Sequence, residues 1–117
     1  MQQNGHKDLI VWQKAMDLVV ELYLLLPQFP KEEVFGLSAQ MKRAAVSIPS
    51  NIAEGYHRAS PKDRKHFFVI AFGSAAELET QIEIAKRLHY LNGNECDKVD
   101  ALLNEVLRIL NKMTKSD

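Results

Sequence analysis

A run of basic side chains within residues 42–66 is the part of the sequence best suited to binding chemistry. Lysines and arginines outnumber carboxylates there by four, although the whole chain has no net charge. Cations grouped in this way attract polyanions, because they displace the counterions that phosphates hold. The candidate nucleic-acid-binding residues are Lys42, Arg43, Arg58, Lys62, Arg64 and Lys65. The alternative is a solvated basic loop with no ligand.

Residues with metal-binding or nucleophilic chemistry are few and isolated. Glu54 and His57 form one E-x-x-H spacing, whereas di-metal helical bundles use two such motifs and two further glutamates. Cys96, the only cysteine, lies at a predicted helix start, a position that can lower the pKa of a thiol, but no base pairs with it. A glycine-rich phosphate loop is also missing. We therefore predict a protein that is not an enzyme and that holds no metal and no cofactor.

Helical periodicity accounts for the segments that must position these residues. We expect helices over about 8–26, about 33–58, from Ser60 towards an Asn92-Gly93 stop, and from an N-cap at Asn94 to about Met113. The predicted fold class is all-α, with one domain over 1–117 whose residues 1–7 and 114–117 are frayed. Short connections favour an antiparallel up-down-up-down four-helix bundle.

The second helix contains Pro49, which would ordinarily divide it into two. Its apolar positions keep one phase on both sides of Pro49, so we predict a continuous helix that is kinked there. In the third helix, Ser60 is the predicted N-cap with Pro61 after it, and Gly73-Ser74 the predicted close contact with another helix. The inner face of the third helix is predicted to comprise Phe68, Ala71, Phe72, Ala75, Leu78, Ile82, Ala85 and His89.

The first and fourth helices carry more apolar residues than one seam requires. The expected seam of the first is Leu9, Trp12, Met16, Val19, Tyr23 and Leu26, and that of the fourth is Val99, Leu102, Val106, Ile109 and Met113. Further apolar stripes indicate either a subunit interface or a wide core face. The candidate oligomer-interface residues are Ile10, Leu18, Leu22, Leu25, Phe67, Leu103 and Leu107.

Length and composition limit the location of the protein. The polar N-terminal residues lack the apolar stretch of a signal peptide, and the longest apolar run, 18–26, is too short for a bilayer. A single cysteine suits a reducing compartment. We expect a cytoplasmic protein with no membrane partner.

The run at residues 36–55, which contains Ser-Ile-Pro-Ser-Asn-Ile-Ala-Glu-Gly, is distinctive. It resembles the four-helix-bundle proteins encoded in intervening sequences of bacterial 23S rRNA genes, once labelled ribosomal proteins. The resemblance extends upstream to residues 9–15 and downstream through Arg58, Phe67 and residues 71–79. One departure is His6, which stands where the family often has phenylalanine.

The resemblance implies a homopentameric, non-enzymatic bundle. It also implies kinship with the accessory proteins of diversity-generating retroelements, which bind a reverse transcriptase and nucleic acid through basic surfaces. Two hypotheses follow from the residues and the resemblance together. The first is an oligomer that binds RNA or DNA, and the second is a scaffold that binds another polypeptide such as a reverse transcriptase.

Overall fold

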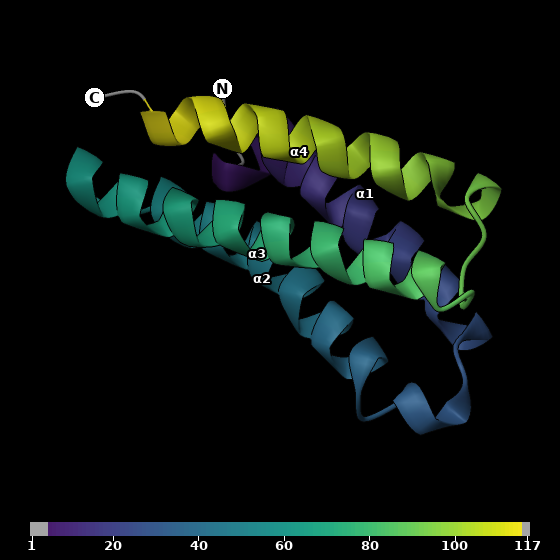
Figure 1. Ribbon diagram of the computed structural model, residues 1–117. Helices are drawn as coiled ribbons and strands as arrows, with labels where there is room; N and C mark the ends of the chain where they lie inside the picture. Colours follow the sequence, from purple (N-terminus) through teal and green to yellow (C-terminus); the bar gives the residue numbers. More distant parts are fainter. Residues whose placement is uncertain (1–4, 116–117) are drawn as a thin grey trace.

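The computed structural model describes residues 5–115, and these are helical with no strand among them (Figure 1). Four α-helices form the domain: α1 (Ile10–Leu25), α2 (Leu37–Tyr56), α3 (Pro61–Arg87) and α4 (Asp97–Lys115). Short 3-10 helices precede or connect them: η1 (Gly5–Asp8), η2 (Leu26–Gln28), η3 (Lys31–Glu33) and η4 (Asn94–Cys96). The all-α prediction is confirmed.

Each α-helix packs against two others, so that one core lies between them. The main contacts join α1 to α2 and α4, and α3 to α2 and α4. Of the end residues that were predicted to be frayed, 5–7 belong to η1 and 114–115 to α4, whereas 1–4 and 116–117 lie outside the described residues. No helix within residues 5–115 is long and apolar enough to cross a bilayer.

The core face of α1 differs from the predicted seam. Its buried residues are Val11, Ala15, Leu18 and Leu22, whereas Met16 and Tyr23 are exposed. Both sets recur at three- and four-residue spacing, so periodicity alone fits either. Helix α1 packs against α2 on one side and α4 on the other, and this packing decides that the set around Ala15 forms the core face. The small side chain of Ala15 is fully buried.

Helix α2 continues through Pro49, as its periodicity predicted, with bounds shorter than the expected 33–58. Pro49 is itself buried. The predicted apolar face is largely confirmed, with Leu37 only partly buried at its start; the buried members are Met41, Ala44, Ala45, Ile48 and Ile52. Burial on both sides of the proline offsets its lost hydrogen bond, since each fully buried isoleucine contributes about 1.5–3 kcal/mol.

The start of α3 agrees with the prediction and its end does not. Ser60 Oγ accepts the backbone N–H of Asp63 at 3.0 Å. The helix ends at Arg87 because His89 adopts a φ of +63°. The N–H groups of His89 and Tyr90 then close a Schellman motif on the carbonyls of the last turn. The predicted stop at Asn92-Gly93 and the inner position of His89 are therefore wrong, because the chain turns at an exposed histidine.

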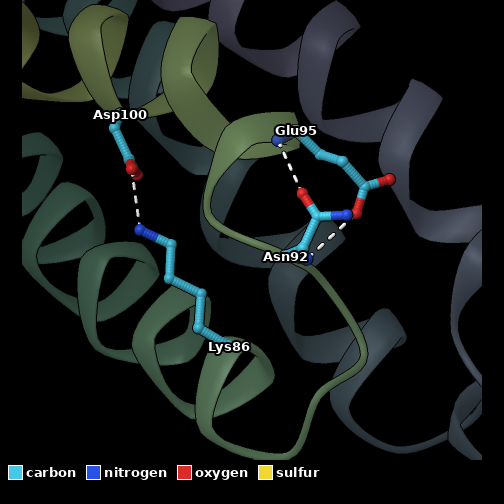
Figure 2. A network of polar contacts seen from close by, with 4 residues as sticks. All are labelled: Lys86, Asn92, Glu95 and Asp100. Atoms are coloured by element: carbon cyan, nitrogen blue, oxygen red, sulfur yellow. Dashed lines mark hydrogen bonds and ion pairs between the residues drawn. The ribbon is translucent and has the colours of Figure 1, made fainter.

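Asn92 instead prepares the start of α4 (Figure 2). Its Oδ1 accepts the Glu95 N–H at 3.0 Å, and Glu95 Oε1 accepts the Asn92 N–H at 2.9 Å. This reciprocal pair is a capping box around η4, which leads into α4, so the predicted N-cap at Asn94 is wrong because Asn94 already lies within η4. Nearby, Lys86 Nζ lies 2.7 Å from Asp100 Oδ2 and ties α3 to α4. That hydrogen bond raises the pKa of Lys86.

Gly73 and Cys96 have surroundings other than those predicted, whereas Ser74 makes the predicted contact with another helix. A Cβ at Gly73 would meet nothing within 4 Å, so Gly73 is not a close-contact position within the chain. Its neighbour Ser74 does contact α2, through a 2.8 Å hydrogen bond to Ser47 Oγ. Cys96 lies fully buried, and burial raises the pKa of its thiol rather than lowering it.

Candidate nucleic-acid interface

The corner between α2 and α3 carries four of the six predicted cations. Arg58 lies two residues after the end of α2, and Lys62, Arg64 and Lys65 lie in the first two turns of α3. All four are exposed. The short connection brings them together because Ser60 and Pro61 start α3 only a few residues after α2 ends. We call these four residues the basic corner.

A close helix approach beneath the basic corner fixes its shape. An added Cβ on Gly55 would lie 2.7 Å from the Phe68 ring and 3.1 Å from the Arg64 carbonyl oxygen. Glycine therefore lets α2 and α3 meet here with almost no gap. Arg64 Nε also donates a 2.8 Å hydrogen bond to the Arg58 carbonyl. The two arginines are thus held in one local unit rather than on independent loops.

Arg58 is the most organised cation of the corner. Its guanidinium lies 2.8 Å from Glu54 and 4.7 Å from the centre of the Phe67 ring. Stacking on an aromatic face orients the guanidinium plane and leaves further N–H groups for an acceptor. Among the described residues, no carboxylate lies within ion-pair distance of Lys62 or Lys65. These two lysines can therefore meet phosphate without first losing a partner.

The structure does not bring Lys42 and Arg43 to the basic corner. They lie near the start of α2, about 20 Å along the helix from its end at Tyr56. Lys42 Nζ lies 5.2 Å from the centre of the Tyr23 ring on α1. Arg43 lines a polar hollow of about 380 Å³ between α2 and α3, together with Ser47, Ser74 and Glu77. Four of the six predicted cations thus lie together at the basic corner, whereas Lys42 and Arg43 lie apart from it and face different helices.

Sequence reasoning did not associate the end of α4 with the basic corner. Lys112 and Lys115 are exposed in the last turns of α4. Figure 1 shows this end of α4 at the same end of the molecule as the start of α3. The signal available in the sequence was the predicted alternation of helix direction, which would turn the fourth helix back towards the second connection. These lysines enlarge the cationic end of the protein.

The E-x-x-H pair serves local contacts rather than a shared ligand. Glu54 faces Arg58, whereas His57 Nε2 lies 2.9 Å from His6 Nδ1. His6 also packs edge-on against Trp12, with ring centres 5.2 Å apart. His6 thus anchors η1 to the start of α1 and to the end of α2. Within residues 5–115, no three His, Cys, Asp or Glu side chains gather in a way that could hold a metal ion.

Three of the seven candidate interface residues are part of the core of the single chain. Leu18, Leu22 and Leu103 are 0–2% exposed, so the prediction that they face a partner is wrong. They complete a wide core stripe, which was the alternative reading of the surplus apolar residues. Leu25, Phe67 and Leu107 are half-buried, and only Ile10 is largely exposed. Sequence reasoning missed Phe35, which is 95% exposed next to the start of α2.

These features define a class of protein: a small all-helical domain with four α-helices and a cationic end. The chain belongs to the family of 23S rRNA-intervening sequence proteins, since the family model matches residues 7–112. The fold is similar to a crystal structure of a protein of unknown function from the S23 ribosomal protein family of Bacteroides thetaiotaomicron. The TM-score is 0.83 at 24% sequence identity, over 92% of this chain and 100% of that chain. Comparison with curated proteins gives no match.

Proposed function

We propose that the protein is a non-enzymatic homo-oligomer, pentameric and cytoplasmic, that binds nucleic acid, and RNA in particular, through the basic corner. The observation that supports this most directly is the exposure of four cations at one rigid helix connection. Arg58 adds an oriented guanidinium over the Phe67 ring, a geometry suited to a phosphate or a base. Membership of the intervening-sequence family points to RNA as the first ligand to test.

The proposed assembly matters for binding because a single corner is weakly charged. With Glu54 and Asp63 included, the basic corner has an excess of two positive charges. In a ring of five copies with aligned corners, one face would carry an excess of about ten, enough to bind a polyanion in a salt-dependent manner. The neutral net charge of the chain is then no obstacle, because the negative charge lies on other surfaces.

The arrangement of the helices is part of the same proposal. We propose that successive helices run in opposite directions and that α2 bends at Pro49. The contact of His6 with His57 supports this order, since it places the start of the chain beside the end of α2. A crystal structure that gives the helix-axis angle across Pro49 tests the bend, and a straight α2 contradicts it.

The binding experiment is fluorescence anisotropy with labelled single-stranded RNA, duplex RNA and duplex DNA over a series of salt concentrations. Replacing Lys62 and Lys65 by Gln removes two cations without breaking any hydrogen bond or ion pair within the described residues. We expect weaker binding and a slope of log K against log salt that is smaller by about 1.4 for single strands. The control with the same change in charge replaces Arg87 and Lys98 by Gln, at the other end of α3 and at the start of α4; it also removes the exposed ion pairs of these cations with Glu83 and Glu21. Equal effects in both double variants, or no binding at low salt, contradict the proposal.

The second candidate function is a scaffold that binds another polypeptide, such as a reverse transcriptase. Large exposed apolar side chains favour it, above all Phe35, Leu24 and Ile10 at 95%, 67% and 63% exposure. A pull-down from nuclease-treated cells discriminates the two functions. Recovery of one stoichiometric protein supports the scaffold, whereas loss of all bound material after nuclease treatment contradicts it.

A further inference from the structure

The turn between η3 and α2 displays a single aromatic ring to solvent. Phe35 is 95% exposed, and Val34 beside it is 55% exposed. Glu33 holds this turn in place: Oε1 accepts the Leu37 N–H at 3.0 Å and Oε2 accepts the Tyr90 hydroxyl at 2.9 Å. A Cβ on Gly36 would lie 2.7 Å from Glu33 Oε1, so glycine leaves room for this cap. Phe35 is therefore presented by a turn with a fixed shape.

A groove between α1 and α2 is complementary to such a ring. It has a volume of about 350 Å³ and a mostly apolar lining: Trp12, Met16, Val19, Val46, Pro49, Ser50 and Ala53. At about 30 Å³ for each water molecule, that is room for more than ten waters, and more than one phenyl ring requires. Apolar concave surfaces of this size are typical binding sites for an aromatic anchor.

Phe35 cannot fill the groove of its own chain. It precedes the start of α2 at Leu37, and the groove is centred near Pro49, about 18 Å further along the helix. The surroundings are also complementary in charge. Glu32 and Glu33 precede the ring and outnumber Lys31 in the same turn, whereas Lys42 lies one helical turn before the groove residue Val46, over the Tyr23 ring of α1. The excess negative charge of the turn and the cation beyond one end of the groove attract each other between molecules.

We propose that Phe35 of one copy inserts into the α1–α2 groove of a second copy. The inference rests on the self-assembly in the proposed function and identifies the surfaces that meet. Ring and groove are different surfaces, so the contact is heterologous, and its repetition closes a ring or extends a filament. Exposed Val20 and Leu24 on α1 add apolar area towards the roughly 800 Å² per partner that stable interfaces bury.

The test is sedimentation velocity over a concentration series with the full chain, alone and in mixtures. Phe35→Ala has a groove but no ring, and Val46→Glu has a ring but a blocked groove. We expect each variant alone to associate at least about thirtyfold more weakly than the wild-type chain, as for a hot-spot residue. Mixed in equal amounts, they should form a one-to-one heterodimer and nothing larger, because one intact ring meets one intact groove.

Controls separate this contact from general effects on folding and charge. Ile84→Ala and Val69→Glu alter exposed apolar residues of α3 outside both surfaces, and they should retain the wild-type mass. Met16→Glu blocks the same groove from the α1 wall, and it should behave like Val46→Glu if both retain the wild-type helical content by circular dichroism. A Phe35→Ala variant with the wild-type mass, or a mixture that stays monomeric, overturns the inference.

The two proposals fail in different ways. A wild-type chain that is monomeric at all concentrations refutes both the ring-in-groove contact and the self-assembly in the proposed function, whereas an assembly that Phe35→Ala leaves intact refutes the contact alone. RNA binding by the basic corner is measured independently of both. An assembly that depends on Phe35 but binds no RNA or DNA at low salt supports this contact and refutes the proposed ligand.

Discussion

Replacing Gly55 by alanine should destabilise the protein, although alanine is the better helix former. The new Cβ would lie 2.7 Å from Phe68 Cε1 and 3.1 Å from the Arg64 carbonyl oxygen, against an ordinary contact of at least 3.4 Å. The second neighbour is backbone, so α3 itself must move. Overpacking of this kind costs about 1–3 kcal/mol, and the gain in helix propensity offsets about 1 kcal/mol. The expected net loss is about 1 kcal/mol, or about 4 °C in Tm.

Gly73→Ala is the matched control, because it makes the same chemical change in the interior of α3. A Cβ there would meet nothing within 4 Å. Only the propensity gain remains, so we expect a stabilisation of about 1 kcal/mol and a Tm higher by about 4 °C. Thermal unfolding followed by circular dichroism at one protein concentration compares both variants with the wild-type chain. The two changes should have opposite signs.

The reasoning is refuted if Gly55→Ala raises the Tm, or if both variants shift it in the same direction. The basic corner provides a second readout, since Gly55 lies directly beneath it. Separation of α2 from α3 should weaken the hydrogen bond from Arg64 Nε to the Arg58 carbonyl. Gly55→Ala should therefore also reduce RNA affinity, whereas Gly73→Ala should not.

Three further perturbations test the ends of α3 and the turn before α2. Ser60→Ala removes the cap on the Asp63 N–H and should cost about 1 kcal/mol in urea unfolding, with Ser60→Asp restoring it. His89→Gly should stabilise the chain by about 1 kcal/mol, because glycine adopts a φ of +63° without a Cβ clash; a lower unfolding midpoint contradicts this. The hydrogen bonds from Leu37 and Tyr90 lower the pKa of Glu33 below 4.5, so the folded state binds that proton less tightly than the unfolded chain. Its contribution is therefore present above pH 4.5 and lost as the pH falls through the folded-state pKa. Glu33→Gln should be less stable than the wild-type chain at pH 7, and the difference in stability should narrow in acid. A difference in stability that does not change with pH contradicts the role of the Glu33 carboxylate.

The helical architecture could be predicted because its signals are local. Ser60 and Pro61 predict a helix start because both residues favour the backbone geometry of a helix N-terminus. The apolar residues on both sides of Pro49 keep one helical phase, which predicts a single helix. The core face of α1 could not be predicted in the same way. The buried set that begins at Val11 and the predicted seam that begins at Leu9 both follow helical spacing. Only contact with α2 and α4 selects between them.

The end of α3 shows a different limit. Asn92-Gly93 is the better stop by local propensity, yet the chain turns at His89 and uses Asn92 as a cap. Tertiary packing decides here, since Tyr90 must reach Glu33 and lies against Phe29. The candidate site also combines a local and a non-local feature. The cations of the α2–α3 connection were correctly predicted to lie together, because they are close in sequence. The separation of Arg43 from the basic corner depends on the length of α2.

The buried Cys96 thiol can report how often the protein opens locally. The thiol is the only one in the sequence, it is fully enclosed at the start of α4, and burial raises its pKa, which disfavours the reactive thiolate. A thiol reagent can therefore react only when the packing around Cys96 opens. Its labelling rate, divided by that of the unfolded chain, gives the population of the open form. Chemical labelling kinetics can thus follow motions of this end of the bundle without any engineered probe.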